Sequence, residues 1–239
     1  MPLDPATDRD REDPPMATAT VPIPITGQVV KTPTVADLLA RYGEVLSLRI
    51  VLVPAPGTAT VEDVVAIHDR EDRLCELVDG VLVEKAMGYL ESNMACVLIQ
   101  ILLNYLDRNP LGVVAGEGGM IRLAPGLVRI PDVSFVSRDQ FPDGKVGSEP
   151  VPFLSPTLAV EILSRGNTKA EMDRKLIDYF AAGSKLVWYL DPADRSVRVY
   201  TAPDQSTRLD ESQTLDGGEV LPGFALPIRE WFERAERPF

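Results

Sequence analysis

The sequence predicts an α/β protein with a mixed central β-sheet flanked by helices, and three patterns support this prediction. Residues 75–84 alternate in polarity around an Asp-Gly pair, which is the strongest short-range signal for a β-hairpin. Residues 89–106 repeat apolar side chains at helical spacing, which indicates one long helix with a buried face. Residues 158–191 then follow the order strand, helix, strand, which is typical of α/β folds.

The chain is expected to divide into three regions. Residues 1–30 mix proline, aspartate, arginine and threonine without a helix or strand period, so we expect a flexible tail. Residues 31–70 are predicted to form a helical extension, with short helices at 34–43 and 61–68. Residues 71–239 are expected to form the folded domain.

The remaining elements of the domain follow from shorter apolar runs and turn residues. Residues 141–156 are rich in proline and glycine and are predicted to form a loop. Gly183 follows the predicted helix 168–182, at a position where glycine commonly ends a helix. Strands are predicted at 112–115, 120–123, 130–136, 158–164, 185–191 and 196–201, with a turn-linked strand pair at 214–221.

The composition restricts the class of function. The net charge of −12 and the pI near 4.6 argue against a broad electrostatic grip on nucleic acid, so any site for a polyanion must be local. Cys75 and Cys96 are the only cysteines and His68 is the only histidine, which excludes a disulfide framework and a multi-histidine metal site. No apolar run approaches the ~18 residues of a membrane span, and the acidic N-terminus lacks a signal peptide. We therefore expect a cytoplasmic protein.

Two carboxylates interrupt apolar strands and define the candidate site. Asp132 lies in the predicted strand 130–136, and Glu161 lies in the predicted strand 158–164. A carboxylate in such a run costs several kcal/mol unless it is paired or bound to a metal ion. If the two strands are neighbours, both carboxylates can meet and offer the hard oxygen ligands that Mg²⁺ or Mn²⁺ prefers. A metal ion there would activate water for phosphodiester hydrolysis.

A lysine on the next predicted helix completes this constellation. Lys175 lies on the flank of the apolar stripe of helix 168–182, near the sheet rather than in open solvent. An ammonium group there can orient or deprotonate the attacking water, or stabilise the developing negative charge. Lys169 lies closer to the centre of the stripe but in the first turn, so it is the rival candidate.

Each candidate also has an ordinary structural explanation. Asp132 follows a proline at a strand start, where turn and cap formers are common. Lys175 taken alone would be a solvated helix lysine, and Glu76 fits a surface position at the hairpin edge as well as it fits a metal ligand. Glu161 is the hardest to explain structurally, because an apolar strand rarely tolerates a charge.

The combination of these segments resembles the Uma-two-type family of restriction endonucleases, within the PD-(D/E)XK nuclease-like superfamily. The similarity covers about residues 60 to 230 and rests on four blocks of sequence. These blocks are Cys75-Glu76-Leu77-Val78-Asp79-Gly80-Val81-Leu82-Val83-Glu84, Pro131-Asp132-Val133, Val160-Glu161-Ile162-Leu163-Ser164 with the downstream Asn167-Thr168, Lys175-Leu176 and Tyr179, and Ala182-Gly183-Ser184-Lys185-Leu186-Val187-Trp188-Tyr189-Leu190-Asp191-Pro192.

The resemblance implies a restriction-endonuclease-like core with a metal-dependent nuclease site. Asp132 and Glu161 match the acidic motif positions, and Glu76 matches an acidic position that can join the metal ligands. The usual motif lysine would fall at position 163, where this chain has leucine, and the family supplies that lysine from the following helix, which points to Lys175. Many members have a histidine at the start of the long helix, where this chain reads Glu91-Ser92-Asn93-Met94.

The sequence therefore predicts a Mg²⁺- or Mn²⁺-dependent endonuclease that hydrolyses DNA. Cleavage of both strands of a duplex commonly needs two sites, so a homodimer is expected. Two alternatives remain open. One is a catalytically weak nuclease-fold protein that acts as a binding or assembly module, which the negative net charge favours. The other is a hydrolase of small phosphoesters, which needs no long nucleic-acid groove.

Overall fold

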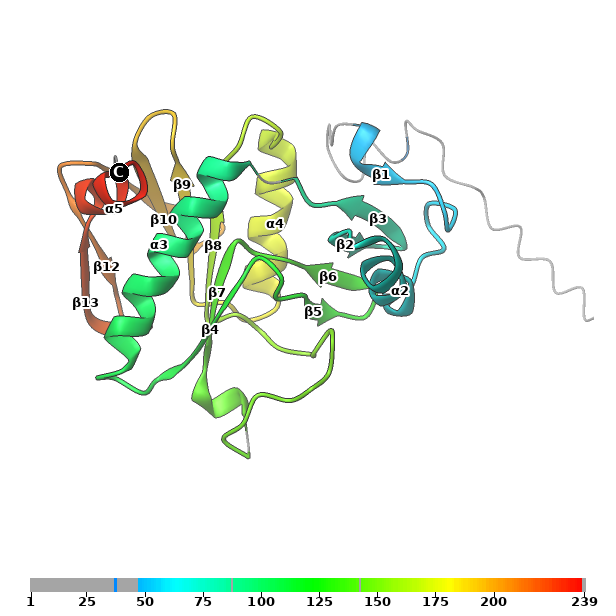
Figure 1. Ribbon diagram of the computed structural model, residues 1–239, viewed down its shortest axis with the longest axis horizontal. Helices are drawn as coiled ribbons and strands as arrows, with labels where there is room; N and C mark the ends of the chain where they lie inside the picture. The colour runs from blue at the N-terminus through cyan, green and yellow to red at the C-terminus, as the bar shows by residue number, and fades with distance from the viewer. Residues whose placement is uncertain (1–36, 38–46, 87, 142, 238–239) are drawn as a thin grey trace, which may run out of the picture. The chain divides into compact units, whose positions relative to one another are not determined.

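The computed structural model describes residues 37, 47–86, 88–141 and 143–237. These residues form two β-sheets and a two-stranded ribbon with helices packed on them (Figure 1). The predicted tail 1–30 lies outside the described residues. The predicted helix 34–43 does too, except for Asp37, which is helical.

The first sheet is five-stranded and contains the predicted hairpin. Its strand order is β1-β3-β2-β6-β5. Asp79 and Gly80 join β2 to β3 with φ angles of 47° and 79°, the left-handed conformations that the Asp-Gly pair favours in a two-residue hairpin turn. Helix α2 (Val61–Glu71) packs on this sheet and extends the predicted helix 61–68 by one turn. The strands are β1 (Ile50–Val51), β2 (Cys75–Val78), β3 (Val81–Glu84), β5 (Ile121–Ala124) and β6 (Leu127–Arg129), and the 3-10 turn η1 (Ser47–Arg49) precedes β1.

The second sheet is six-stranded and mixed. Its strand order is β11-β10-β9-β8-β7-β4, in which β8 and β9 run parallel and all other neighbours run antiparallel. The predicted mixed sheet with a central strand at 158–164 is thereby confirmed. The strands are β4 (Gly112–Gly116), β7 (Val133–Ser137), β8 (Leu158–Ile162), β9 (Leu186–Asp191), β10 (Ser196–Ala202) and β11 (Gln205–Asp210).

The predicted strand 130–136 is wrong in one respect, because the chain changes sheets within it. Strand β6 ends at Arg129 in the five-stranded sheet, and β7 begins at Val133 in the six-stranded sheet. Pro131 lies in the crossover, and proline has no N–H to donate to a strand ladder. Asp132 therefore precedes β7 instead of lying inside a strand, and it occupies the junction between the sheets.

Helices cover both faces of the six-stranded sheet. Helix α3 (Tyr89–Leu106), which has the predicted bounds, packs on one face with α5 (Ile228–Ala235) and the ribbon of β12 (Thr214–Gly217) and β13 (Leu221–Pro227). Helix α4 (Lys169–Ala181) packs on the other face and also contacts side chains of β5. The side chain of Thr168 caps α4 by accepting a hydrogen bond from the N–H of Glu171. No helix among the described residues is long and apolar enough to cross a membrane.

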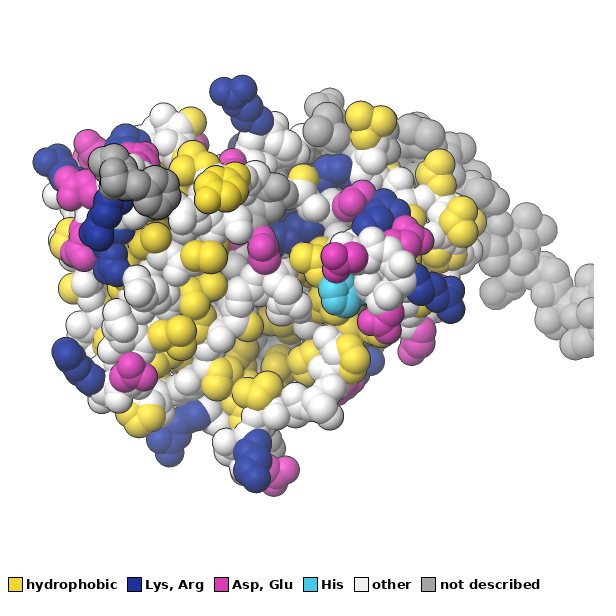
Figure 2. Space-filling view, viewed as in Figure 1, with side chains coloured by type: hydrophobic (Ala, Val, Ile, Leu, Met, Phe, Trp, Pro, Cys, Tyr) yellow, Lys and Arg dark blue, Asp and Glu magenta, His cyan; other side chains and the backbone are white. Residues whose placement is uncertain are grey.

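Charged side chains are dispersed over the face of the molecule that Figure 2 shows. Figure 2 shows lysine and arginine side chains scattered among acidic and polar ones on the visible face, without a broad basic area. This distribution agrees with the net charge of −12. On this face, a binding site for a polyanion would have to be local.

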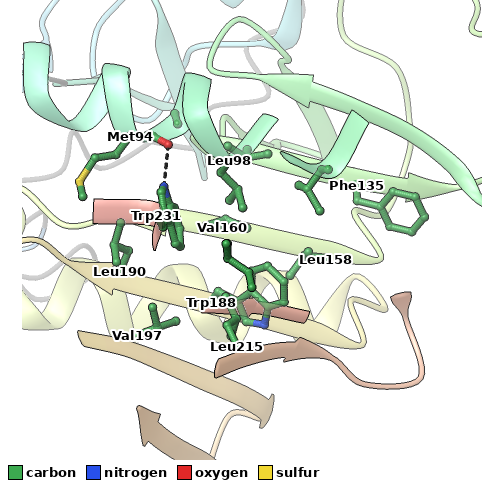
Figure 3. Packing of buried hydrophobic residues seen from close by; sticks show 14 of the residues in the cluster. Met94, Leu98, Phe135, Leu158, Val160, Trp188, Leu190, Val197, Leu215 and Trp231 are labelled. Carbon is green, nitrogen blue, oxygen red and sulfur yellow. Dashed lines mark hydrogen bonds between the residues drawn. The ribbon is translucent and has the colours of Figure 1, made fainter. Parts of the chain in front are cut away.

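The main hydrophobic core lies between the six-stranded sheet and α3. Val160 and Trp188 of the sheet are fully buried, and so are Leu98 of α3 and Trp231 of α5 (Figure 3). The indole N–H of Trp231 donates to the carbonyl of Met94 at 3.0 Å, which fixes α5 against α3. The alternation of β8 thus directs Val160 into this aliphatic core and leaves its opposite face, with Glu161, to helix α4.

Candidate active site

The two predicted carboxylates lie beside each other, Asp132 directly before β7 and Glu161 in the neighbouring strand β8. The antiparallel register of β7 and β8 pairs Val133 with Val160, and extending it by one residue places Asp132 opposite Glu161. Both residues are 4% exposed. The N–H of Ile162 donates to Asp132 Oδ2 at 2.6 Å, so the backbone of β8 holds the aspartate against its neighbour.

A lysine that the sequence analysis did not identify pairs with the aspartate. Lys85, directly after β3, lies with its Nζ 2.7 Å from Asp132 Oδ1, and it donates to the carbonyl of Ile130 at 2.6 Å. Its side chain is 6% exposed. A single buried lysine at the end of a strand produces no periodicity, so only the need of Asp132 for a partner could have indicated it.

Lys175 reaches the carboxylates from helix α4. Its Nζ lies 3.1 Å from Glu161 Oε2 and 3.0 Å from Glu76 Oε1, and its side chain is 3% exposed. The rival Lys169 is 87% exposed and pairs with Asp173 on the same helix. The structure therefore brings Lys175 to the site and leaves Lys169 in solvent, while the catalytic role of Lys175 stays a prediction.

Glu76 is buried in β2, and cations and a backbone amide surround it. Arg129 Nη1 donates to Glu76 Oε2 at 2.7 Å, and the N–H of Ile130 donates to Oε1 at 3.2 Å. Arg129 also pairs with Asp178 of α4. Glu76 is 1% exposed, which excludes the alternative of a surface residue at the hairpin edge.

Each of the three predicted metal ligands is paired with a cation. Lys175 lies between Glu76 and Glu161, and Lys85 is bonded to Asp132. Within the described ranges, no three His, Cys, Asp or Glu side chains are grouped so that they could hold a metal ion. Metal binding by Glu76, Asp132 and Glu161 therefore stays a prediction.

Burial and neighbouring charges shift the pKa values of Glu76 and Glu161 in opposite directions. Burial favours the neutral form of Glu76, but the charges of Lys175 and Arg129 outweigh it and lower the pKa of Glu76 to about 2. Burial raises the pKa of Glu161 above its ordinary value; Lys175 opposes this increase, and Asp132 adds to it. Burial alone would lower the pKa of Lys175, but Glu161 and Glu76 raise it, so the ammonium remains charged at neutral pH.

A small cavity opens onto these groups. It has a volume of about 10 Å³, room for roughly one water molecule, and Asp132, Glu161, Lys85 and Lys175 are among the side chains that line it. The Asp132 and Glu161 carboxylates supply the hard oxygen donors that suit Mg²⁺ or Mn²⁺, so this donor set fits such an ion once the lysine contacts are exchanged.

A wider hollow adjoins the small cavity. Its volume is about 920 Å³, and it shares Glu91, Ser164 and Asn167 with the smaller cavity. Glu91 belongs to the first turn of α3. The hollow therefore lies next to the cavity that the carboxylates line.

Arg49, in the 3-10 turn η1, links helix α4 to the end of strand β3 beside the site. Its guanidinium donates to both carboxylate oxygens of Glu171 on α4 at 2.9 and 3.0 Å. Its Nε donates to the carbonyl of Glu84 at 2.8 Å, directly before Lys85. No pattern in the sequence indicates this role, because these partners lie far from Arg49 along the chain.

Comparisons with known proteins identify a family and a similar fold. Residues 61–229 match the family described as "Putative restriction endonuclease" (Uma2). The fold is similar to the crystal structure of a putative nuclease belonging to DUF820 from Anabaena variabilis ATCC 29413, with a TM-score of 0.61 and 17% identity over 69% of this chain and 92% of that chain. No match was found among curated proteins.

Proposed function

Because the chain belongs to the Uma2 family, described as putative restriction endonucleases, we propose that it is a nuclease that hydrolyses DNA phosphodiesters with Mg²⁺ or Mn²⁺. One observation supports this proposal above the others. Asp132 and Glu161 lie side by side at a small cavity, with the buried ammonium of Lys175 bonded to Glu161. Acidic oxygen donors beside a fixed cation form the arrangement that metal-assisted phosphodiester hydrolysis needs.

In this proposal Asp132 and Glu161 hold the metal ion. When bound, the ion supplies an activated water and neutralises charge on the phosphate. The N–H of Ile162 fixes the orientation of Asp132. The hydroxyl of Tyr179 donates to Glu161 Oε1 and does the same for the glutamate.

Lys175 acts in this proposal as a fixed positive charge. Its raised pKa keeps it protonated at neutral pH, which favours stabilisation of negative charge over abstraction of a proton from water. Glu76 accepts from Lys175, from Arg129 and from a backbone N–H. We therefore propose that Glu76 positions Lys175, and that metal binding rests mainly on Asp132 and Glu161.

Two further features remain proposals. A homodimer would present two sites to a duplex, which cleavage of both strands requires. A cytoplasmic location agrees with the free cysteines Cys75 and Cys96.

A second candidate function is the hydrolysis of small phosphoesters. The dispersed surface charge in Figure 2 favours it, because a small substrate needs no broad basic surface. The hollow of about 920 Å³ beside the site has a size typical of small-molecule pockets.

One experiment tests these proposals together. Purified protein is incubated with plasmid DNA, a labelled oligonucleotide or bis(p-nitrophenyl) phosphate, each with Mg²⁺, Mn²⁺ or EDTA. Glu161→Gln and Asp132→Asn should abolish metal-dependent cleavage of DNA, whereas Glu219→Gln, a change at an exposed glutamate, should retain it. Cleavage of the small ester alone would support the second function. If the wild-type protein cleaves none of the substrates, the enzyme proposals fail and the binding or assembly module is favoured.

A further inference from the structure

The side chain of Lys85 occupies a site that suits a cation. Its Nζ contacts two oxygens, Asp132 Oδ1 at 2.7 Å and the carbonyl of Ile130 at 2.6 Å, and its side chain is 6% exposed. A carboxylate and a backbone carbonyl are also ligands that a hard divalent cation accepts. The ammonium thus lies where the proposed metal ion would approach Asp132.

Lys85 is not needed to orient Asp132. The N–H of Ile162 already donates to Asp132 Oδ2 at 2.6 Å. This bond comes from the central strand β8 and fixes the carboxylate independently of Lys85. The main effect of Lys85 on Asp132 is therefore to neutralise its charge.

The charges of the buried network support the same interpretation. Its ion pairs join four cations to four buried carboxylates, so these charges balance; the cations are Lys85, Lys175, Arg129 and Arg174, and the carboxylates are Glu76, Asp132, Glu161 and Asp178. Without Lys85 one negative charge would be in excess, and this excess would favour the binding of a metal cation. With Lys85 in place, the ion and the ammonium would compete for the same oxygen and repel each other.

We propose that the Lys85 ammonium is a resident cation that a divalent metal ion must displace from Asp132. This inference rests on the proposed metal site. Glu91 lines the same cavity as Lys85 and is partly exposed. Its side chain makes no hydrogen bond or ion pair with another described residue, so it is available to receive the displaced ammonium. Lys85 thereby raises the concentration of metal ion that is needed to fill the site.

Metal titrations test this inference directly. Binding of Mn²⁺ is measured by isothermal titration calorimetry on the wild-type protein, Lys85→Gln and Lys85→Arg, with Lys145→Gln as a control at an exposed lysine. Lys85→Gln retains a hydrogen-bond donor for Ile130 but loses the charge, so we expect it to bind Mn²⁺ at least about tenfold more tightly than wild type. Lys85→Arg and Lys145→Gln should bind no more tightly than wild type. Equal or weaker binding by Lys85→Gln would overturn the inference.

A second measurement uses the wild-type protein and guards against a variant that does not fold. An amine-specific acylating reagent is applied with and without Mn²⁺, and modification of Lys85 is quantified by mass spectrometry. Displacement from Asp132 should expose Lys85 and raise its modification at least about threefold, while modification of Lys145 should stay constant. If Mn²⁺ leaves the modification of Lys85 unchanged or lowers it, the lysine is not displaced.

The titrations also separate this inference from the proposed function. If the wild-type protein binds Mn²⁺, Glu161→Gln does not, and Lys85→Gln binds no more tightly, the metal site stands and the competition is refuted. If only Lys85→Gln binds Mn²⁺, the competition is supported in its strongest form. If neither protein binds Mn²⁺, the metal site is refuted and the inference falls with it.

Discussion

Replacing Glu76 by glutamine tests the buried charge network most directly. The change keeps the shape of the side chain but removes its negative charge. That charge pairs with Arg129, whose Nη1 lies 2.7 Å from Oε2, and with Lys175, whose Nζ lies 3.0 Å from Oε1. Removing one partner of a buried ion pair typically costs ~3–5 kcal/mol, because the remaining charge is left uncompensated. We therefore expect Glu76→Gln to lower the free energy of unfolding strongly.

The pKa of Glu76 gives an independent magnitude. The folded protein lowers this pKa from its ordinary 4.5 to about 2. Each pKa unit is worth ~1.4 kcal/mol, so the charged form contributes about 3 kcal/mol to stability at neutral pH. In a domain of this size that loss corresponds to a decrease in Tm of roughly 6–12 °C.

The sign of the pH dependence follows from the lowered pKa. The contribution is fully present above pH 4.5, and it is lost as the pH falls from 4.5 toward 2. The difference in stability between wild type and Glu76→Gln should therefore shrink over that range. Urea denaturation followed by the fluorescence of the buried Trp188 and Trp231 measures it.

Glu161→Gln is the matched control for this experiment. Burial raises the pKa of Glu161, which shows that its site tolerates the neutral form, and Tyr179 can still donate to the amide oxygen. We expect a loss of at most ~1 kcal/mol. A loss below ~1 kcal/mol for Glu76→Gln, or a difference from wild type that stays constant between pH 5 and pH 3, would refute the reasoning.

Three further predictions concern the site and the hairpin. Lys175→Met should abolish nuclease activity and lower the free energy of unfolding, measured by urea denaturation, by ~3 kcal/mol or more. Lys169→Met, at an exposed position, should stay within ~0.5 kcal/mol of wild type. Equal losses of stability in the two variants would contradict the difference between the buried and the exposed lysine. Mn²⁺ affinity measured by calorimetry should rise as the pH rises through the raised pKa of Glu161, because the protonated carboxyl cannot bind the ion, and an affinity independent of pH would contradict this. Gly80→Ala should lower Tm by ~4 °C or more, because the new Cβ would lie 2.6 Å from backbone atoms, while Gly126→Ala, with a similar φ of 72° but open space, should lower it less.

The sequence predicted the elements whose pattern is local. Glu161 was recognisable because it interrupts a strand that is apolar on both faces, and β8 is indeed central. The angle of Lys175 around its helix placed it on the side of the sheet, where the structure finds it. The Asp-Gly pair at 79–80 specified the hairpin turn and its backbone conformation.

What the sequence analysis missed depends mostly on pairing between distant segments. Lys85 and Arg49 acquire their roles only from partners far along the chain, so no spacing could reveal them. Strand β11 is polar and exposed, and only its ladder with β10 defines it. Helix α5 was missed although a local pattern indicates it, because Trp231 and Phe232 follow Ile228 at helical spacing.

The change of sheets at Asp132 has a consequence for the order in which the site is made. Glu76 and Lys85 come from the five-stranded sheet, whereas Glu161 and Lys175 come from the six-stranded sheet and the helix packed on it. During translation the first pair is synthesised well before the second. A partly synthesised chain therefore has neither the complete carboxylate pair nor its fixed ammonium, and chemistry at the site has to wait until both sheets have formed.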